Sequence, residues 1–220
     1  MKVSTDAVVL GAYSGSKAPH KILDIGTGTG VIALMLAQRY TQAKVIALEL
    51  DKHACLQAAE NVRCSPWSKQ VTVVEAALQD YSNCDERFDL IVSNPPYFPN
   101  HLLSEDVRRN HALHQGTLTF AELTVGANKL LTEGGEFWVI LPQRQMAEFE
   151  LIAKDVGFSA LKRIEIRDSR YKPVLRVIQA FGKRKPISGS FEAIELVIKG
   201  DDGKFSDAYR SLLKDFMLHF

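Results

Sequence analysis

The sequence predicts an α/β fold in which a mostly parallel sheet is covered by helices on both faces. Short β-branched or apolar runs alternate with longer helical patterns through residues 21–156, the order that builds parallel strands joined by crossover helices. Only a short connection separates the apolar runs at 162–166 and 174–181, so this pair is expected to be antiparallel. The chain has 220 residues and is 46% hydrophobic, enough for one sizeable core. We therefore expect seven strands, the last of them antiparallel.

Each element is predicted from its periodicity and its boundaries. Strands are expected at 21–25, 43–48, 71–74, 88–92, 136–141, 162–166 and 174–181. Helices are expected at 29–39, 52–62, 120–131 and 143–156, the third of them ended by Gly134 and Gly135. A further short strand is expected within 188–200, and a closing helix at 206–218 with Ser206 as its N-cap. We interpret 1–220 as one domain, with 189–220 as its C-terminal strand and helix extension.

Composition excludes several classes of protein. The net charge is +1, so total charge gives no sign of a nucleic-acid partner. The three cysteines (Cys55, Cys64 and Cys84) are odd in number and lack CxxC spacing, which argues against a disulfide framework and a zinc site. His111 and His114 have a metal-ligand spacing, but no cluster of acids or thiols joins them. Without a membrane-length apolar stretch or a signal peptide, we expect a cytoplasmic monomer that binds neither metal nor membrane.

A glycine turn follows the first predicted strand and precedes the first predicted helix. Gly26, Gly28 and Gly30 let the backbone turn tightly and approach a ligand, and amides at a helix start favour a negative group. The spacing is GxGxG, so no pyrophosphate need be bound. Glu49 ends the second strand, where this kind of fold binds a ribose, and Asp24 stands beside the turn. An amino-acid carboxylate at the amides and a ribose at Glu49 fit S-adenosylmethionine; an ordinary strand-to-helix turn is the alternative.

The tetrad Asn94-Pro95-Pro96-Tyr97 directly follows an apolar strand. The prolines stop the strand and restrict the turn, which predicts a rigid corner at the carboxyl end of the sheet. Oxygen acceptors from the Asn94 side chain and the Pro95 backbone could hold both hydrogens of an exocyclic amine and aim its lone pair at a methyl group. Tyr97 could stack on an extruded base or lie near a sulfonium. The alternative is a strand-ending turn with a packed tyrosine.

Basic residues suggest where a nucleic acid would bind. Arg108 and Arg109 belong to a long loop between Tyr97 and Thr119, and long loops of this kind are commonly functional. Residues 162–185 include nine basic side chains and only two acidic ones. The basic side chains could form a track for phosphates. Within that run, Arg170 and Lys172 lie in the short turn between the last two predicted sheet strands. Solvated strand faces are the alternative reading.

Together these motifs resemble the Rossmann-like class I methyltransferases that use S-adenosylmethionine and act on exocyclic amines. The similarity is greatest to the bacterial tRNA-Val adenine-N6 methyltransferases, whose N-terminal motif, turn after the second helix and closing segment resemble residues 2–12, 65–67 and 200–209. This resemblance implies methylation of an adenine in the tRNA anticodon loop, with Asp6 and the glycine turn in the cofactor pocket. Relatives usually carry an acid for the cofactor's adenine where Ala77 stands, and Asp80 is three residues displaced.

The residues expected to act fall into three groups. Catalysis is assigned to Asn94, Pro95, Pro96 and Tyr97. Cofactor binding is assigned to Asp6, Asp24, Gly26, Thr27, Gly28, Gly30, Glu49, Leu50, Ala77 and Asn94. RNA binding is assigned to Arg108, Arg109, Arg170 and Lys172. Three alternatives stay open: guanine-N2 methylation of ribosomal RNA, glutamine methylation of a protein, and an RNA-binding module without enzyme activity.

Overall fold

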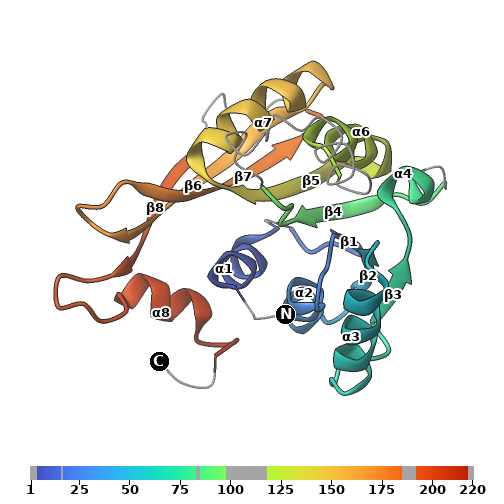
Figure 1. The fold of residues 1–220 in the computed structure, drawn as a ribbon, viewed down its shortest axis with the longest axis horizontal. Helices are drawn as coiled ribbons and strands as arrows, with labels where there is room; N and C mark the ends of the chain where they lie inside the picture. Colours follow the sequence, from blue (N-terminus) through green and yellow to red (C-terminus); the bar gives the residue numbers. More distant parts are fainter. Residues whose placement is uncertain (1–3, 16, 83–84, 98–117, 185–191, 218–220) are drawn as a thin grey trace, which may run out of the picture.

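The computed structural model of the protein describes residues 4–15, 17–82, 85–97, 118–184 and 192–217. One sheet of eight strands runs through it in the order β3-β2-β1-β4-β5-β7-β6-β8 (Figure 1). The strands are β1 (Lys21–Ile25), β2 (Lys44–Glu49), β3 (Val71–Glu75), β4 (Phe88–Ser93), β5 (Leu131–Leu141), β6 (Ser159–Ser169), β7 (Val174–Gly182) and β8 (Glu192–Lys199).

Helices cover both faces of this sheet, as expected for the α/β class. They are α1 (Thr5–Tyr13), α2 (Val31–Arg39), α3 (Lys52–Arg63), α4 (Leu78–Tyr81), α6 (Phe120–Leu130), α7 (Gln143–Asp155) and α8 (Asp207–Leu213). In Figure 1, α1, α2, α3 and α8 lie below the sheet, whereas α4, α6 and α7 lie above it. Ser206 is the N-cap of α8 as predicted, because its hydroxyl accepts the amide hydrogen of Tyr209 at 3.1 Å.

The expected strand count of seven is wrong, since the sheet has eight strands. β7 is the antiparallel strand, but it lies between β5 and β6 and not at an edge. The further strand predicted within 188–200 is β8, which pairs with β6 in parallel and forms the edge of the sheet. Edge position and strand order depend on pairing between distant segments, which local periodicity does not encode.

The sequence pattern predicted that Gly134 and Gly135 end a helix, and this prediction is wrong. Helix α6 ends at Leu130, and both glycines lie inside β5. The pairing of β4 with β5 shifts register here, and a Cβ on Gly135 would lie 3.0 Å from the Asp89 carbonyl oxygen. The glycine pair therefore marks an irregularity of the strand where two backbones approach closely.

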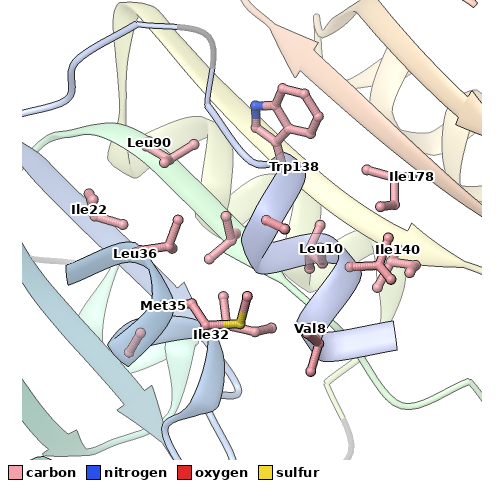
Figure 2. Packing of buried hydrophobic residues seen from close by; sticks show 14 of the residues in the cluster. Val8, Leu10, Ile22, Ile32, Met35, Leu36, Leu90, Trp138, Ile140 and Ile178 are labelled. Atoms are coloured by element: carbon pink, nitrogen blue, oxygen red, sulfur yellow. The ribbon is translucent and has the colours of Figure 1, made fainter. Parts of the chain in front are cut away.

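Two apolar clusters, one on each face, hold the layers together. The lower cluster joins α1 and α2 to the central strands, and Figure 2 shows Leu10 of α1 and Met35 of α2 among strand residues such as Trp138 and Ile140. The upper cluster joins α4, α6 and α7 to the other face, with Phe137, Phe149 and other phenylalanines in mutual contact. Because both faces are buried, the carboxyl ends of the central strands are fixed relative to one another.

Two negative findings apply to the residues described. None of their helices is long and apolar enough to cross a membrane. Their histidine, cysteine and acidic side chains form no group of three that could hold a metal ion. Cys55 and Cys64 are free thiols, whereas Cys84, His111 and His114 lie outside the described residues.

Candidate active site

The glycine turn and the tetrad meet because their strands are neighbours. β1 pairs in parallel with β2 on one side and β4 on the other, and the register sets Ile25 opposite Ser93. The Ser93 hydroxyl donates to the Ile25 carbonyl at 3.0 Å and ties the two strand ends together. The carboxyl ends of β1, β2 and β4 therefore form one edge, the place where open α/β sheets bind ligands.

The glycine turn has the backbone that its composition predicted. Gly26, Gly28 and Gly30 have φ values of 71°, 59° and 83°, in the left-handed region that glycine adopts without strain. The amides of Gly26 and Thr27 donate to the Leu48 carbonyl at 2.9 and 3.0 Å, which fixes the turn against the end of β2. A Cβ on Gly26 would meet nothing within 4 Å, so this position opens onto free space.

Three backbone amides hold the carboxylate of Glu49. Oε2 accepts from Gly28 at 2.8 Å, while Oε1 accepts from Leu50 and Asp51 at 2.9 Å each. A carboxylate offers about four acceptor positions, so it keeps capacity for a hydroxyl of a ligand. Glu49 thus bridges the glycine turn and the start of α3 and lies on the ligand edge.

Asp24 is fully buried beneath the turn. Its Oδ2 accepts from the Thr27 hydroxyl at 2.5 Å and from the Ala33 amide at 3.2 Å, whereas its buried Oδ1 has no hydrogen-bond partner in the described structure. Burial raises the pKa of this carboxyl to about 7, and the two hydrogen bonds act in the opposite direction. A buried acid with one unpaired oxygen suits a cationic or donor group of a ligand.

A pocket of about 460 Å³ lies along this edge. It is lined by Gly26, Glu49, Leu50 and Ala77 from the predicted cofactor set and by Pro95 and Pro96 from the tetrad. Residues assigned from separate motifs therefore share one cavity. Its size falls within the range of small-molecule sites.

Ala77, Gln79 and Glu122 line the same pocket at α4 and α6. Ala77 is the N-cap residue of α4 and offers no side-chain group for a ligand. Hydrogen bonds from the Thr119 backbone and hydroxyl, and then from Gln79, lower the pKa of Glu122. Asp80 is exposed and is not among the pocket residues. The sequence interpretation did not include Gln79 and Glu122, because neither belongs to a motif.

The tetrad forms a corner directly after β4. Pro95 is buried, Pro96 is exposed, and Asn94 is half-buried. Within the described part of the chain, no hydrogen bond of the Asn94 side chain is found.

Tyr97 lies in a cluster with Asp6 of α1 and Arg176 of β7. The Arg176 Nε donates to Asp6 Oδ2 at 2.7 Å, Nη2 donates to the Tyr97 hydroxyl, and the guanidinium carbon lies 4.9 Å from the centre of the tyrosine ring. The Asp6 and Arg176 side chains are each only 19% exposed. Asp6 is not among the residues that line the pocket, and its described contacts are with Arg176 and with the Tyr97 hydroxyl, which donates to Asp6 Oδ2 at 3.4 Å. Its cofactor role stays a prediction. In the sequence, Arg176 is one of many basic residues. Its role could not be predicted there, because its partners lie 79 and 170 residues away along the chain.

The predicted RNA-binding residues are only partly described. Arg108 and Arg109 lie outside the described residues. Arg170 and Lys172 are exposed in the turn between β6 and β7. The RNA role of all four residues stays a prediction.

Comparison with solved structures shows the fold first. A predicted O-methyltransferase from Agrobacterium tumefaciens has the same fold, with a TM-score of 0.74, 20% identity and coverage of 96% of each chain. TrmN from Thermus thermophilus matches 81% of this chain and 48% of its own, with a TM-score of 0.57 and 21% identity. The fold is thus that of the methyltransferases.

The chain belongs to the methyltransferase small domain family, whose model matches residues 14–167. Relatives over the full chain are similar as well. A protein of Photorhabdus laumondii subsp. laumondii named tRNA1(Val) (adenine(37)-N6)-methyltransferase is 40% identical over 100% of this chain and 90% of its own. A protein of the same name from Pedobacter heparinus is 40% identical over 100% and 92%.

Proposed function

We propose that the protein transfers a methyl group from S-adenosylmethionine to the exocyclic N6 of an adenine in tRNA. The observation that carries this proposal is the shared pocket, where Gly26 and Glu49 line the same cavity as Pro95 and Pro96. Relatives 40% identical over the whole chain carry the name of a tRNA adenine-N6 methyltransferase, which supports the choice of substrate. An enzyme acting on tRNA would work in the cytoplasm.

The residues present fit S-adenosylmethionine. Glu49 would accept hydrogen bonds from the ribose hydroxyls, and Leu50, Leu78 and Pro95 offer apolar surface to the adenine. Asp24 lies buried beneath the glycine turn and does not line the pocket, so it would act on the cationic amino group of the methionine part through the turn that it holds and not by direct contact. Gln79, which lines the pocket two residues after Ala77, would offer its amide to the cofactor's adenine in place of the acid that relatives usually carry. When bound, the cofactor supplies an electrophilic methyl group on a sulfonium.

The tetrad would prepare the target amine by position alone. The nitrogen lone pair of an adenine amine is delocalised into the ring, so the free amine is a poor nucleophile. The Asn94 oxygen and the Pro95 carbonyl would each accept one N–H and favour a pyramidal nitrogen. A nitrogen held in this way needs no strong base, and one of its protons passes to solvent once the methyl group is attached. Arg176 covers one face of the Tyr97 ring, so a stacked base would use the other face.

Nucleoside analysis of the product tests this function. The protein is incubated with total tRNA and isotopically labelled S-adenosylmethionine, and the tRNA is then digested and analysed by mass spectrometry. Labelled N6-methyladenosine is the expected product. Labelled N2-methylguanosine would show that the methylated base is guanine and not adenine. Label in protein alone would contradict an RNA substrate. Absence of cofactor binding in a calorimetric titration would favour a non-enzymatic RNA-binding module.

A further inference from the structure

The turn between β6 and β7 presents an aromatic ring between two cations. The Lys172 amide donates to the Ser169 carbonyl at 3.0 Å, which closes a β-turn around Arg170 and Tyr171. Arg167 Nη1 donates to the Lys172 carbonyl at 2.7 Å and holds the turn from the side. Tyr171 is 84% exposed. A ring on a fixed backbone loses little conformational freedom when it binds a partner.

The two cations of this turn, unlike most basic side chains nearby, form no ion pair within the described residues. Most of those are neutralised by acids, in the ion pairs Arg163–Glu150, Arg167–Glu195, Arg176–Asp6, Lys183–Glu133 and Lys199–Asp168. Arg170 and Lys172 have no ion-pair partner within the ranges that the structure describes. Part of the positive charge of the predicted phosphate track is therefore exposed and free of ion pairs at the tip of this hairpin.

The hairpin tip lies on the same edge of the sheet as the tetrad. β7 runs antiparallel to β5 and sets Val177 opposite Leu141, the carboxyl end of β5. Residues before Val177 extend beyond that edge, and Arg176 there contacts Tyr97. Tyr171 is five residues further along the chain, in the turn beyond the start of β7, which sets an upper limit of about 17 Å on its reach from Arg176. In Figure 1 the hairpin of β6 and β7 projects to the left, past α1.

We propose that Tyr171 stacks on an unpaired base of the RNA substrate, a few nucleotides from the methylated adenine, while Arg170 and Lys172 contact the flanking phosphates. This inference rests on the proposed function and adds a second, non-catalytic contact to it. Aromatic rings beside cations suit single-stranded nucleic acid, because every unpaired base exposes a flat face between two phosphates. A fully paired duplex exposes no such face along its length.

Equilibrium binding to two RNAs tests the stacking. A labelled tRNA anticodon stem-loop and a fully paired duplex of equal length are titrated with the wild type, Tyr171→Ala, Tyr171→Phe and the control Leu151→Ala, whose side chain on α7 is 68% exposed. Tyr171→Ala should weaken stem-loop binding about 5- to 100-fold with an unchanged salt dependence. Tyr171→Phe and the control should stay within about twofold of the wild type.

The charge contribution is measured separately. Arg170→Ala and Lys172→Ala should each lower the slope of log affinity against log salt by about 1. Lys69→Ala, an exposed cation just before β3 at the opposite edge, should leave the slope unchanged.

Three outcomes would overturn the inference. In the first, Tyr171→Ala binds the stem-loop as tightly as the wild type does. In the second, Tyr171→Ala loses as much affinity for the duplex as for the stem-loop. In the third, Tyr171→Phe loses as much affinity for the stem-loop as Tyr171→Ala does. If the wild type methylates tRNA and Tyr171→Ala binds normally, only the stacking contact is wrong. If the wild type methylates no tRNA at all, the proposed function itself fails.

Discussion

At the scale of single residues, Asp24 has an environment that its neighbours in sequence do not reveal. Its carboxyl is buried, accepts two hydrogen bonds through one oxygen and leaves the other oxygen unpaired. Burial raises its pKa from an ordinary value of 3.8 to about 7. The folded protein therefore keeps this proton in a pH range where the unfolded chain has lost it.

Asp24 should lower the free energy of unfolding by roughly 4 kcal/mol at most as the pH rises from about 4 to about 7. Above about pH 7 its effect should no longer change with pH. The sign follows from the raised pKa, since the folded state binds more protons than the unfolded state in this window. Thermal unfolding of the wild type and Asp24→Asn between pH 4.5 and 8 measures the difference. Asp80→Asn, at an exposed acid, is the control. Parallel curves for the wild type and Asp24→Asn would contradict the assignment.

Asn94→Ala should reduce kcat by about 10²- to 10³-fold, because it removes one of the two acceptors that hold the amine. Binding of S-adenosylmethionine, measured by calorimetry, should change by less than about threefold. Asn94→Asp keeps the oxygen acceptors and is the matched variant, expected to retain more activity than Asn94→Ala. Full activity of Asn94→Ala would show that another group positions the amine.

Arg176 is inferred to be a positioning residue that acts through Tyr97. Lysine keeps the charge but loses the planar fork that reaches Asp6 and the Tyr97 hydroxyl together. Arg176→Lys should therefore lower kcat about tenfold while cofactor affinity stays near the wild-type value. Arg163→Lys, on the neighbouring strand β6, is the control. A change in cofactor affinity alone would place Arg176 in the cofactor site.

At the scale of elements, the local sequence pattern predicts most strands and helices, whereas pairing between distant strands decides where those strands lie in the sheet. The first four strands and their helices follow from alternating apolar runs, and the glycine turn has the left-handed φ values that its residues require. The edge position of β8 and the course of β5 past Gly134 depend on partners far along the chain. For the same reason the pocket residues Glu49 and Pro95 could be predicted from motifs, whereas the contacts of Arg176 could not.

Close packing of α6 on α4 gives a prediction at this scale. A Cβ on Gly126 of α6 would lie 2.7 Å from Cδ2 of the buried Leu78 of α4. Gly126→Ala should destabilise the protein by about 1–3 kcal/mol and weaken cofactor binding, since α4 carries pocket residues. Gly134→Ala, where a Cβ meets nothing within 4 Å, is the control for the added methyl group. Thermal unfolding and calorimetry check both effects, and equal stability of the two variants would contradict the packing argument.

At the scale of the whole molecule, one edge of the sheet collects the parts of the site. The glycine turn, Glu49, the tetrad and the hairpin tip come from segments between residues 24 and 172, and each lies at the carboxyl ends of the parallel strands or beyond them. The two apolar clusters keep these ends in register. This arrangement would place a cofactor, a target base and flanking RNA side by side on one surface.

A crystal structure with S-adenosylmethionine bound tests the proposed site most directly. We expect the sulfonium methyl to point at the space beside the Asn94 side-chain oxygen and the Pro95 carbonyl, with the ribose at Glu49. A methyl group directed away from that corner, or a corner filled by the protein's own side chains in the complex, would contradict it.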